Sequence, residues 1–316
     1  MGVATGLWFF PGAPGPSVVS TIVAAEQAGL DEVWLGDEGP ARDPFALLAA
    51  AAGVTRTISL GVAVTNPYLR HPAATAATAL TIQELSGGRM TLGMGAGGDL
   101  ALGPAQLKRT RPLEATRRAV RIVRAVSNAE ATEGYTPVDH AIDRKGLPIY
   151  IGARGERLNR FASESADGVF LGGIPFSRLA TTLSWARSVQ RVRASIYVNA
   201  VFDDDALEAI RPQMIWVLID TPEETRQQLG LALEDLLLAA RALGDGDDSL
   251  ARRAVDDVVL DELVLHGTPK TVGRELADRL APLGPDSIGI SLLTGDLAGI
   301  IGPAAEALHV ARARAG

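Results

Sequence analysis

Carboxylates follow two apolar segments of the sequence, each at the point where a turn begins. Asp37 and Glu38 come directly after residues 32–36, and Asp99 follows the glycine-rich residues 93–98. In α/β proteins, catalytic side chains gather at the carboxyl ends of the strands. A carboxyl group in that place can donate a proton or accept a hydrogen bond from a bound cofactor. Solvated surface carboxylates are the alternative for all three residues.

Two neighbouring strand ends carry glycines where the chain enters a helix. The N–H groups of such a turn and the dipole of the following helix form a site for anions. An arginine there adds a charge-assisted hydrogen bond to phosphate. We therefore expect a phosphate site, with glycine turns that hold no ligand as the alternative. The residues concerned are Gly152, Ala153, Arg154 and Gly155 at the first strand end, and Gly172 and Gly173 at the second.

Residues 93–98 read G-M-G-A-G-G, which fits the G-x-G-x-x-G pattern of dinucleotide-binding folds. Here the pattern follows a fourth strand rather than a first, and we expect a loop after it instead of a helix. Gly95 and Gly97 therefore favour another role, which is to let a ligand ring approach the backbone closely. Thr65 and Asn66, at the end of the preceding strand, supply donors and acceptors for the edge of a heterocyclic ring.

These residues must be positioned by a regular alternation of strands and helices. Eight strands are predicted, and a helical, acidic insertion around residues 204–266 precedes the last one. Parallel, right-handed winding of eight such units closes as a barrel, whereas an open doubly wound sheet would have about five to seven strands. The sequence therefore predicts an α/β fold, a (β/α)8 TIM barrel, with residues 1–316 as a single domain. The predicted strands are residues 3–10, 32–36, 58–64, 90–96, 147–153, 167–173, 194–202 and 287–293.

Helices are expected between these strands, and residues 128–145 are expected to form a polar surface excursion. Pro72 can begin one helix and Gly87-Gly88 can end it. The predicted outer helices are residues 17–28, 44–54, 72–85, 111–125, 156–165, 175–188, 270–280 and 298–313. Within the insertion, the predicted helices are residues 206–216, 221–243 and 250–265.

Composition excludes several classes of protein. A formal charge of −7 without a basic block argues against nucleic-acid binding. The absence of cysteine excludes disulfides, thiolate nucleophiles and iron–sulfur clusters. The four histidines, including His140, lie far apart, so no metal site is expected. No signal peptide and no membrane-spanning segment is recognised, which predicts a cytoplasmic protein.

Three motifs resemble the bacterial luciferase-like superfamily. They are V-T-N-P-Y-L-R-H-P at residues 64–72, L-S-G-G-R at residues 85–89, and L-G-M-G-A-G at residues 92–97. Within the superfamily they are most similar to the branch that uses the deazaflavin coenzyme F420, whose type enzyme is methylenetetrahydromethanopterin reductase. The resemblance covers nearly the whole chain. It implies a TIM barrel and an oxidoreductase that passes a hydride between reduced F420 and an electrophilic C=N or C=C bond.

The resemblance also implies roles for individual residues. A non-prolyl cis peptide is expected at Ala63-Val64, behind the cofactor ring, and Asp99 matches an acidic residue near the reacting centre. The run P-I-Y-I-G-A-R-G at residues 148–155 resembles the segment that holds the phosphate. Trp8 stands where methanopterin reductases carry a glutamate, so it is expected to form a pocket wall, together with Tyr68.

Two departures keep other functions open. The family usually has Asp-His where this chain has Asp37-Glu38, and Trp8 replaces the glutamate, which leaves the methanopterin activity in doubt. One alternative is a monooxygenase with reduced FMN as its cofactor, and another is a non-catalytic flavin-binding or partner subunit. The apolar helices at residues 44–54 and 73–85 suggest a homodimer. The substrate is expected to be a small molecule, which the sequence does not identify.

Overall fold

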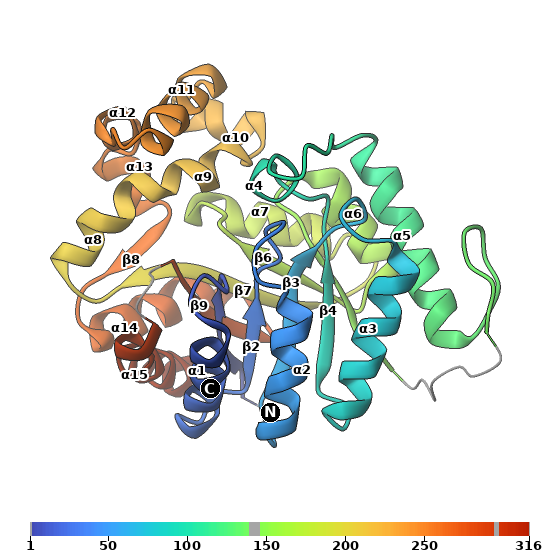
Figure 1. Cartoon of the computed structure of the whole chain (residues 1–316). Helices are drawn as coiled ribbons and strands as arrows, with labels where there is room; N and C mark the ends of the chain where they lie inside the picture. Colours follow the sequence, from blue (N-terminus) through green and yellow to red (C-terminus); the bar gives the residue numbers. More distant parts are fainter. Residues whose placement is uncertain (1, 139–145, 294–296, 316) are drawn as a thin grey trace.

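Eight parallel strands form a closed barrel in the computed structural model, which describes residues 2–138, 146–293 and 297–315. Each strand pairs with the next along the chain. The last strand of the ring, Ser287–Leu292, pairs with Arg193–Val201 before it and with the first strand, Ala4–Phe9, which closes the ring. The predicted TIM barrel is therefore confirmed (Figure 1). The strands of the ring are β1 Ala4–Phe9, β2 Glu32–Leu35, β3 Ser59–Thr65, β4 Met90–Met94, β5 Ile149–Gly152, β6 Gly168–Gly172, β7 Arg193–Val201 and β9 Ser287–Leu292.

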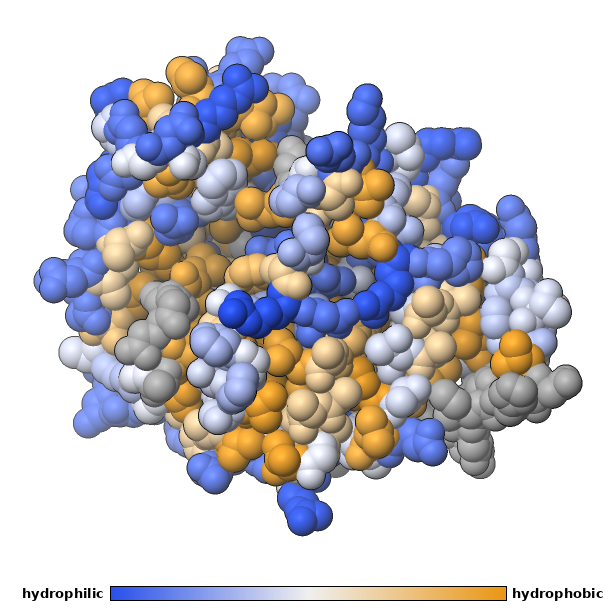
Figure 2. Space-filling model, viewed as in Figure 1, coloured by the Kyte–Doolittle hydropathy of each residue, from blue (hydrophilic) through white to orange (hydrophobic). Residues whose placement is uncertain are grey.

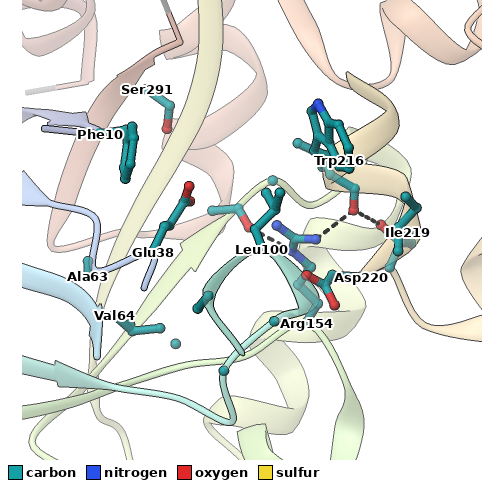
Figure 3. Close-up of a pocket in the computed structure, with 18 of the residues that line it drawn as sticks. Phe10, Glu38, Ala63, Val64, Leu100, Arg154, Trp216, Ile219, Asp220 and Ser291 are labelled. Atoms are coloured by element: carbon teal, nitrogen blue, oxygen red, sulfur yellow. Dashed lines mark hydrogen bonds between the residues drawn. The ribbon is translucent and has the colours of Figure 1, made fainter. Parts of the chain in front are cut away.

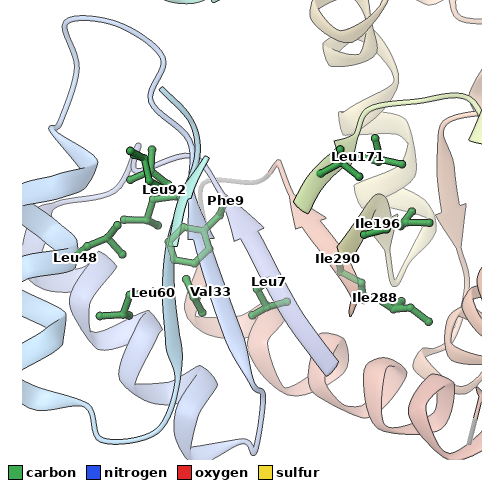
Figure 4. Packing of buried hydrophobic residues seen from close by; sticks show 14 of the residues in the cluster. Leu7, Phe9, Val33, Leu48, Leu60, Leu92, Leu171, Ile196, Ile288 and Ile290 are labelled. Atoms are coloured by element: carbon green, nitrogen blue, oxygen red, sulfur yellow. The ribbon is translucent and has the colours of Figure 1, made fainter. Parts of the chain in front are cut away.

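Helices surround the barrel, and many begin at a proline, whose fixed φ suits the first helical turn. The Asp43 side chain caps the helix Pro44–Val54 by accepting a hydrogen bond of 2.8 Å from the Phe45 amide. Alternate strand residues such as Leu7 and Phe9 point outward into the core between strands and helices (Figure 4). The outer helices are α1 Gly15–Gln27, α2 Pro44–Val54, α3 Pro72–Leu85, α5 Pro112–Asn128, α6 Glu156–Ser165, α7 Phe176–Ala186, α14 Pro269–Leu280 and α15 Leu297–Ala315. A 3-10 turn after α14, η2, spans Ala281–Leu283.

Aromatic side chains fill the inside of the barrel. Phe170 stacks on Tyr197 with 4.8 Å between ring centroids, and Trp34 lies 5.2 Å from Phe170. Glycine makes room for them: a Cβ at Gly289 would lie 2.0 Å from Tyr197 Cε1. Tyr197 donates a hydrogen bond of 2.7 Å to Glu32 Oε1. Because the interior is packed, any large cavity must lie at an end of the barrel.

A helical segment separates β7 from β9 and lies over one side of the barrel mouth (Figure 1). Its apolar side chains form a hydrophobic cluster of their own, which includes Met214, Leu236 and Leu260. The last element of the segment is a strand of three residues, Val264–His266, which pairs with Asn199–Val201 of β7. The elements are α8 Asp204–Ile210, η1 Arg211–Gln213, α9 Met214–Ile219, α10 Glu223–Gln228, α11 Leu233–Gly244, α12 Ser249–Ala254, α13 Asp257–Asp261 and β8 Val264–His266.

The structure corrects the sequence-based expectations for this segment. The predicted helix 221–243 is interrupted after Gln228, where Gly230 has a φ of +72°. The predicted helix 250–265 breaks at Val255, because Asp256 caps a new helix by accepting from the Val259 amide. Its end is a strand rather than a helix, since a short apolar run such as residues 263–265 suits either structure. The predicted helix 206–216 also divides, at the 3-10 turn that contains Pro212.

A short helix, α4 (Asp99–Leu102), follows the glycine-rich run, so the loop expected directly after that run was wrong. In the surface excursion, Thr132 and Tyr135 form an isolated bridge, whereas residues 139–145, with His140, lie outside the described part of the chain. None of the described helices has the length and apolar character needed to cross a membrane. The described residues also contain no cluster of three or more potential metal ligands.

Candidate functional site

A cavity of about 850 Å³ lies at the carboxyl end of the barrel, between the strand ends and the helical segment. Residues that follow β1, β2, β5 and β6 form one side, and α9 to α11 form the other. Figure 3 shows Glu38 and Arg154 from the strand ends and Trp216 from α9 around a common space. The sequence-predicted residues in the lining are Trp8, Asp37, Glu38, Ala63, Val64, Gly97, Gly152, Ala153, Arg154, Gly155, Gly172 and Gly173.

Asp37 and Glu38 are delivered to the cavity by the end of β2, and both are half-buried. Burial raises the pKa of Glu38, Arg154 lowers it, and the charges of Asp220 and Asp37 raise it further. Burial likewise raises the pKa of Asp37, while the Thr65 hydroxyl lowers it. Both carboxyl groups therefore hold a proton to a higher pH than an exposed carboxyl would, which suits a proton donor.

The wall beside these carboxyls is fixed by Trp8. Its indole Nε1 donates a hydrogen bond of 2.6 Å to the carbonyl oxygen of Ala63. The peptide bond between Ala63 and Val64 is cis, at the position that the family resemblance implied. Trp8 lies close over Gly36, where a Cβ would be 2.8 Å from the indole Cζ2. Trp8 thus joins the end of β1 to the end of β3.

Val64 is seated among glycines of the neighbouring strand ends. A Cβ at Gly152 would lie 2.4 Å from Val64 Cγ1, and one at Gly95 would lie 2.7 Å from Val64 Cγ2. Real Cβ atoms do not approach so closely, so these glycines leave the space that the valine occupies. Gly95 itself lies beneath the valine and outside the cavity lining. Val64 therefore presents an apolar side chain to the cavity, against which a flat ring can pack.

Thr65, Asn66 and Tyr68 lie outside the lining of the cavity. Thr65 and Asn66 are buried, and Asn66 Oδ1 accepts hydrogen bonds of 3.1 Å from the amides of Tyr68 and Leu69. The Asn66 Nδ2 atom has no hydrogen-bond partner within the described structure. Tyr68 donates a hydrogen bond of 2.8 Å to the Thr110 carbonyl. Asn66 thus shapes the turn after β3.

The helices α6 and α7, which follow the glycine-rich ends of β5 and β6, begin in different ways. At α6, no side chain caps the first turn, and the N-cap residue Gly155 lines the cavity. At α7, the amides of Phe176 and Ser177 donate to the main-chain and side-chain oxygens of Glu262, with the side-chain hydrogen bond at 2.9 Å. The position that an anion would take at α7 is therefore occupied by the chain's own carboxylate, and the start of α6 is the better anion site.

Arg154 connects the barrel to the helical segment. Its Nη1 donates a hydrogen bond of 2.7 Å to the Val217 carbonyl in α9, and its Nε donates one of 3.3 Å to the Gly172 carbonyl (Figure 3). Burial lowers the pKa of Arg154, and the nearby Asp220 and Glu38 raise it. Arg154 therefore holds the cavity wall together as well as supplying a positive charge at the strand end.

Sequence reasoning missed the lining residues of the helical segment. Asp220 lies 3.6 Å from Arg109 in an ion pair across the cavity edge, and Trp216 lines the same side. Arg109 and Asp220 are far apart in the sequence, so no motif spacing relates them. The sequence indicated only that the insertion is acidic and helical. The side chain of the predicted Asp99 lies outside the described structure, although its backbone begins α4.

The chain is similar to known proteins over most of its length. The family model described as luciferase-like monooxygenase matches residues 9–287. The chain is 28% identical over 313 residues to 5,10-methylenetetrahydromethanopterin reductase of Archaeoglobus fulgidus. The alignment covers 89% of this chain and 94% of that protein. It is 27% identical to F420-dependent glucose-6-phosphate dehydrogenase of Kineococcus radiotolerans, over 72% of this chain and 76% of that protein.

A solved structure shares the fold. It is the coenzyme F420-dependent tetrahydromethanopterin reductase of Methanopyrus kandleri, with a TM-score of 0.80 and 24% sequence identity. The superposition covers 98% of this chain and 97% of that one. The likeness shows that the two chains share a fold.

Proposed function

The chain belongs to the luciferase-like monooxygenase family, and on this premise we propose that it is an oxidoreductase whose cofactor is coenzyme F420. Its substrate would be a small organic molecule with an electrophilic C=N or C=C bond. The proposal rests on two features that line the same cavity. The glycine-seated Val64 offers a surface for a flat ring, and the uncapped start of α6 at Gly155 offers a site for a phosphate.

The residues present fit this cofactor. The free N–H groups at the start of α6 would bind its phosphate, with Arg154 close by as the positive charge. Ala63 and Val64 would lie against its ring, and Trp8 would keep them in place. Bound in reduced form, F420 supplies a hydride from the central ring carbon. Glu38, half-buried and with a raised pKa, would hold the proton that an uncharged substrate requires, and Asp37 or Asp99 could share this role.

FMN is the second candidate cofactor, because the family is named for monooxygenases. FMN presents a similar flat ring and phosphate, so the same wall and helix start would bind it. The two functions differ in chemistry, since a deazaflavin does not support the oxygen activation that a monooxygenase requires. The non-catalytic alternative predicts a folded chain that binds neither cofactor.

Titration of the purified protein with F420 and with FMN, each oxidised and reduced, tests the proposal. Quenching of cofactor fluorescence should give a dissociation constant for F420 at least about tenfold lower than for FMN, equivalent to about 1.4 kcal/mol. A deazaflavin that lacks the phosphate serves as the matched control and should bind more weakly. Tighter binding of FMN would support the monooxygenase, and binding of neither would support the non-catalytic subunit.

We further infer that residues 1–316 form one domain and that the protein acts in the cytoplasm as a homodimer. Figure 2 shows apolar residues gathered over α2, and Val54 and Leu85 near the ends of α2 and α3 are exposed. Such a surface is suited to covering by a second copy. Light scattering should give twice the mass of the chain, and a monomeric mass would refute the dimer.

A further inference from the structure

The cavity has a barrel side and a helical side. The barrel side holds glycines and backbone around Val64 and the start of α6, where the proposed cofactor would lie, together with aromatic side chains such as Phe170. The helical segment supplies the opposite side, on which an apolar patch lies beside polar residues. Leu233 and Leu237 are four residues apart in α11 and face the cavity from one side of that helix. The other apolar residues of this side are Trp216, Val217, Ile219 and Pro222, and its polar residues are Gln213, Asp220, Thr221, Glu223 and Arg226.

The positive charges around the cavity are used to hold its walls together. Arg154 donates to the Val217 and Gly172 carbonyls. Arg109 donates a hydrogen bond of 3.0 Å to the Gly97 carbonyl and also pairs with Asp220. Arg226 donates to the Thr221 carbonyl. A phosphate or carboxylate on the substrate would therefore compete with backbone carbonyls for each of these guanidinium groups.

The acidic side chains of the described lining divide between the two sides. Asp37 and Glu38, whose raised pKa values favour the protonated form, lie on the barrel side, and Asp220 and Glu223 lie on the helical side. Glu223 accepts a hydrogen bond of 3.2 Å from the neutral side chain of Gln227. A desolvated charge of either sign gains nothing from the apolar residues Trp216, Leu233 and Leu237.

We propose that the substrate is an uncharged, predominantly apolar molecule whose body packs on the wall formed by Trp216, Ile219, Leu233 and Leu237. This inference rests on the proposed function, because the cofactor must take the barrel side. It separates this chain from the relatives named for glucose-6-phosphate, whose substrate carries a phosphate. The helical segment is thereby the part of the molecule that determines specificity.

Binding of three bicyclic aromatic probes of similar size tests the inference. The probes are 2-acetylnaphthalene (neutral), 2-naphthoate (anionic) and N-methylquinolinium (cationic), titrated calorimetrically into the protein with and without F420. The neutral probe should bind at least about tenfold more tightly than either ion, since a charged group loses more hydration on entering an apolar site. Equal or tighter binding of an ion would overturn the inference.

Two adjacent leucines of α11 provide a matched pair of variants. Leu237 lines the cavity, whereas Leu238 lies outside the lining and is 56% exposed. Leu237→Ser should weaken binding of the neutral probe about five- to tenfold through lost apolar contact, and Leu238→Ser should leave it unchanged. If Leu237→Ser does not fold, Leu233→Ser replaces it, because Leu233 is 40% exposed and contributes little to the core.

The same measurements distinguish this inference from the proposed function. Neutral-probe selectivity that depends on Leu237 in a protein that binds no F420 would support the apolar wall and refute the cofactor assignment. Tight F420 binding together with an unchanged probe affinity in Leu237→Ser and Leu233→Ser would support the cofactor and overturn the wall.

Discussion

The indole of Trp8 donates its hydrogen bond to the carbonyl oxygen of Ala63, at a distance of 2.6 Å, and so links the ends of two strands that are not adjacent in the barrel. The intervening strand β2 is followed by Gly36, over which the indole passes. This arrangement makes Trp8 a fixed part of the wall that carries Val64.

Trp8→Phe should keep most of the ring packing and remove the hydrogen bond to Ala63. We expect a loss of about 1 kcal/mol in the free energy of unfolding, since the Ala63 carbonyl loses its donor. F420 binding should weaken about fivefold, because Val64 is then less firmly held. Urea denaturation and fluorescence titration measure the two effects. Trp185→Phe, outside the cavity, is the control, and an equal effect in both variants would contradict the assignment.

Gly152→Ala should destabilise the protein by about 1–3 kcal/mol, because the new methyl group would overlap Val64 Cγ1. Adding Val64→Ala should recover much of that loss, and a double-mutant cycle by chemical denaturation measures the coupling. Additive effects of the two substitutions would show that Val64 does not occupy the space beside Gly152.

Gly53→Ala is the control for this pair. Gly53 lies in α2, and open space surrounds the position that an alanine Cβ would take there. Its backbone is helical, so alanine adopts the same conformation without strain. The substitution should raise the stability by about 0.5–1 kcal/mol, as expected for glycine replacement inside a helix.

Gly155→Asp should separate helix stability from anion binding at the start of α6. Gly155 has φ −98° and ψ 157°, which suit an aspartate N-cap, and its nearest neighbour would lie 3.9 Å from the new Cβ. The carboxylate should stabilise the helix by about 0.5 kcal/mol and weaken F420 binding at least about tenfold by repelling the phosphate. Gly155→Ala should bind F420 nearly as the parent does. An unchanged affinity in Gly155→Asp would place the phosphate elsewhere.

Glu38→Gln should stabilise the protein at high pH and have little effect at low pH. Burial raises the folded-state pKa of Glu38 above its unfolded value, so the favourable contribution of the protonated group is lost as the pH rises through the folded-state pKa. The difference in unfolding free energy between variant and parent should therefore grow with pH. Denaturation at a series of pH values measures it, and a constant difference would contradict the raised pKa.

Glu26 should show the opposite dependence on pH. Partial burial would raise the pKa of Glu26, but hydrogen bonds from the amides of Ile58, Thr57 and Arg56 together lower it to about 2. Its contribution is present above the unfolded-state pKa and is lost as the pH falls towards 2. Glu26→Gln should therefore destabilise the protein at neutral pH, by about 1–2 kcal/mol, and much less in acid. Equal destabilisation at both ends of the pH range would argue against this assignment.

The barrel was predictable because strand and helix periodicities alternate along the chain, and the carboxyl ends of parallel strands meet at one edge. The same rule placed Glu38, Val64 and Gly155 around one cavity. What the sequence could not supply depends on contacts between distant residues. Glu262 reaches the Ser177 amide across 85 positions, and no local pattern indicates it. The three-residue strand β8 is likewise too short to carry a periodic signal.

The helical segment is attached to the barrel at both of its ends through β7. It begins at Asp204, just after Val201 ends that strand, and it returns as β8, which pairs Val264 with Asn199 and His266 with Val201. Entry and exit therefore share one anchoring strand, and the ring of eight strands closes without the segment's help. With this layout, the whole helical segment can differ between related chains without disturbing the ring of strands. The recognised molecule would then change while the barrel side of the cavity stays the same.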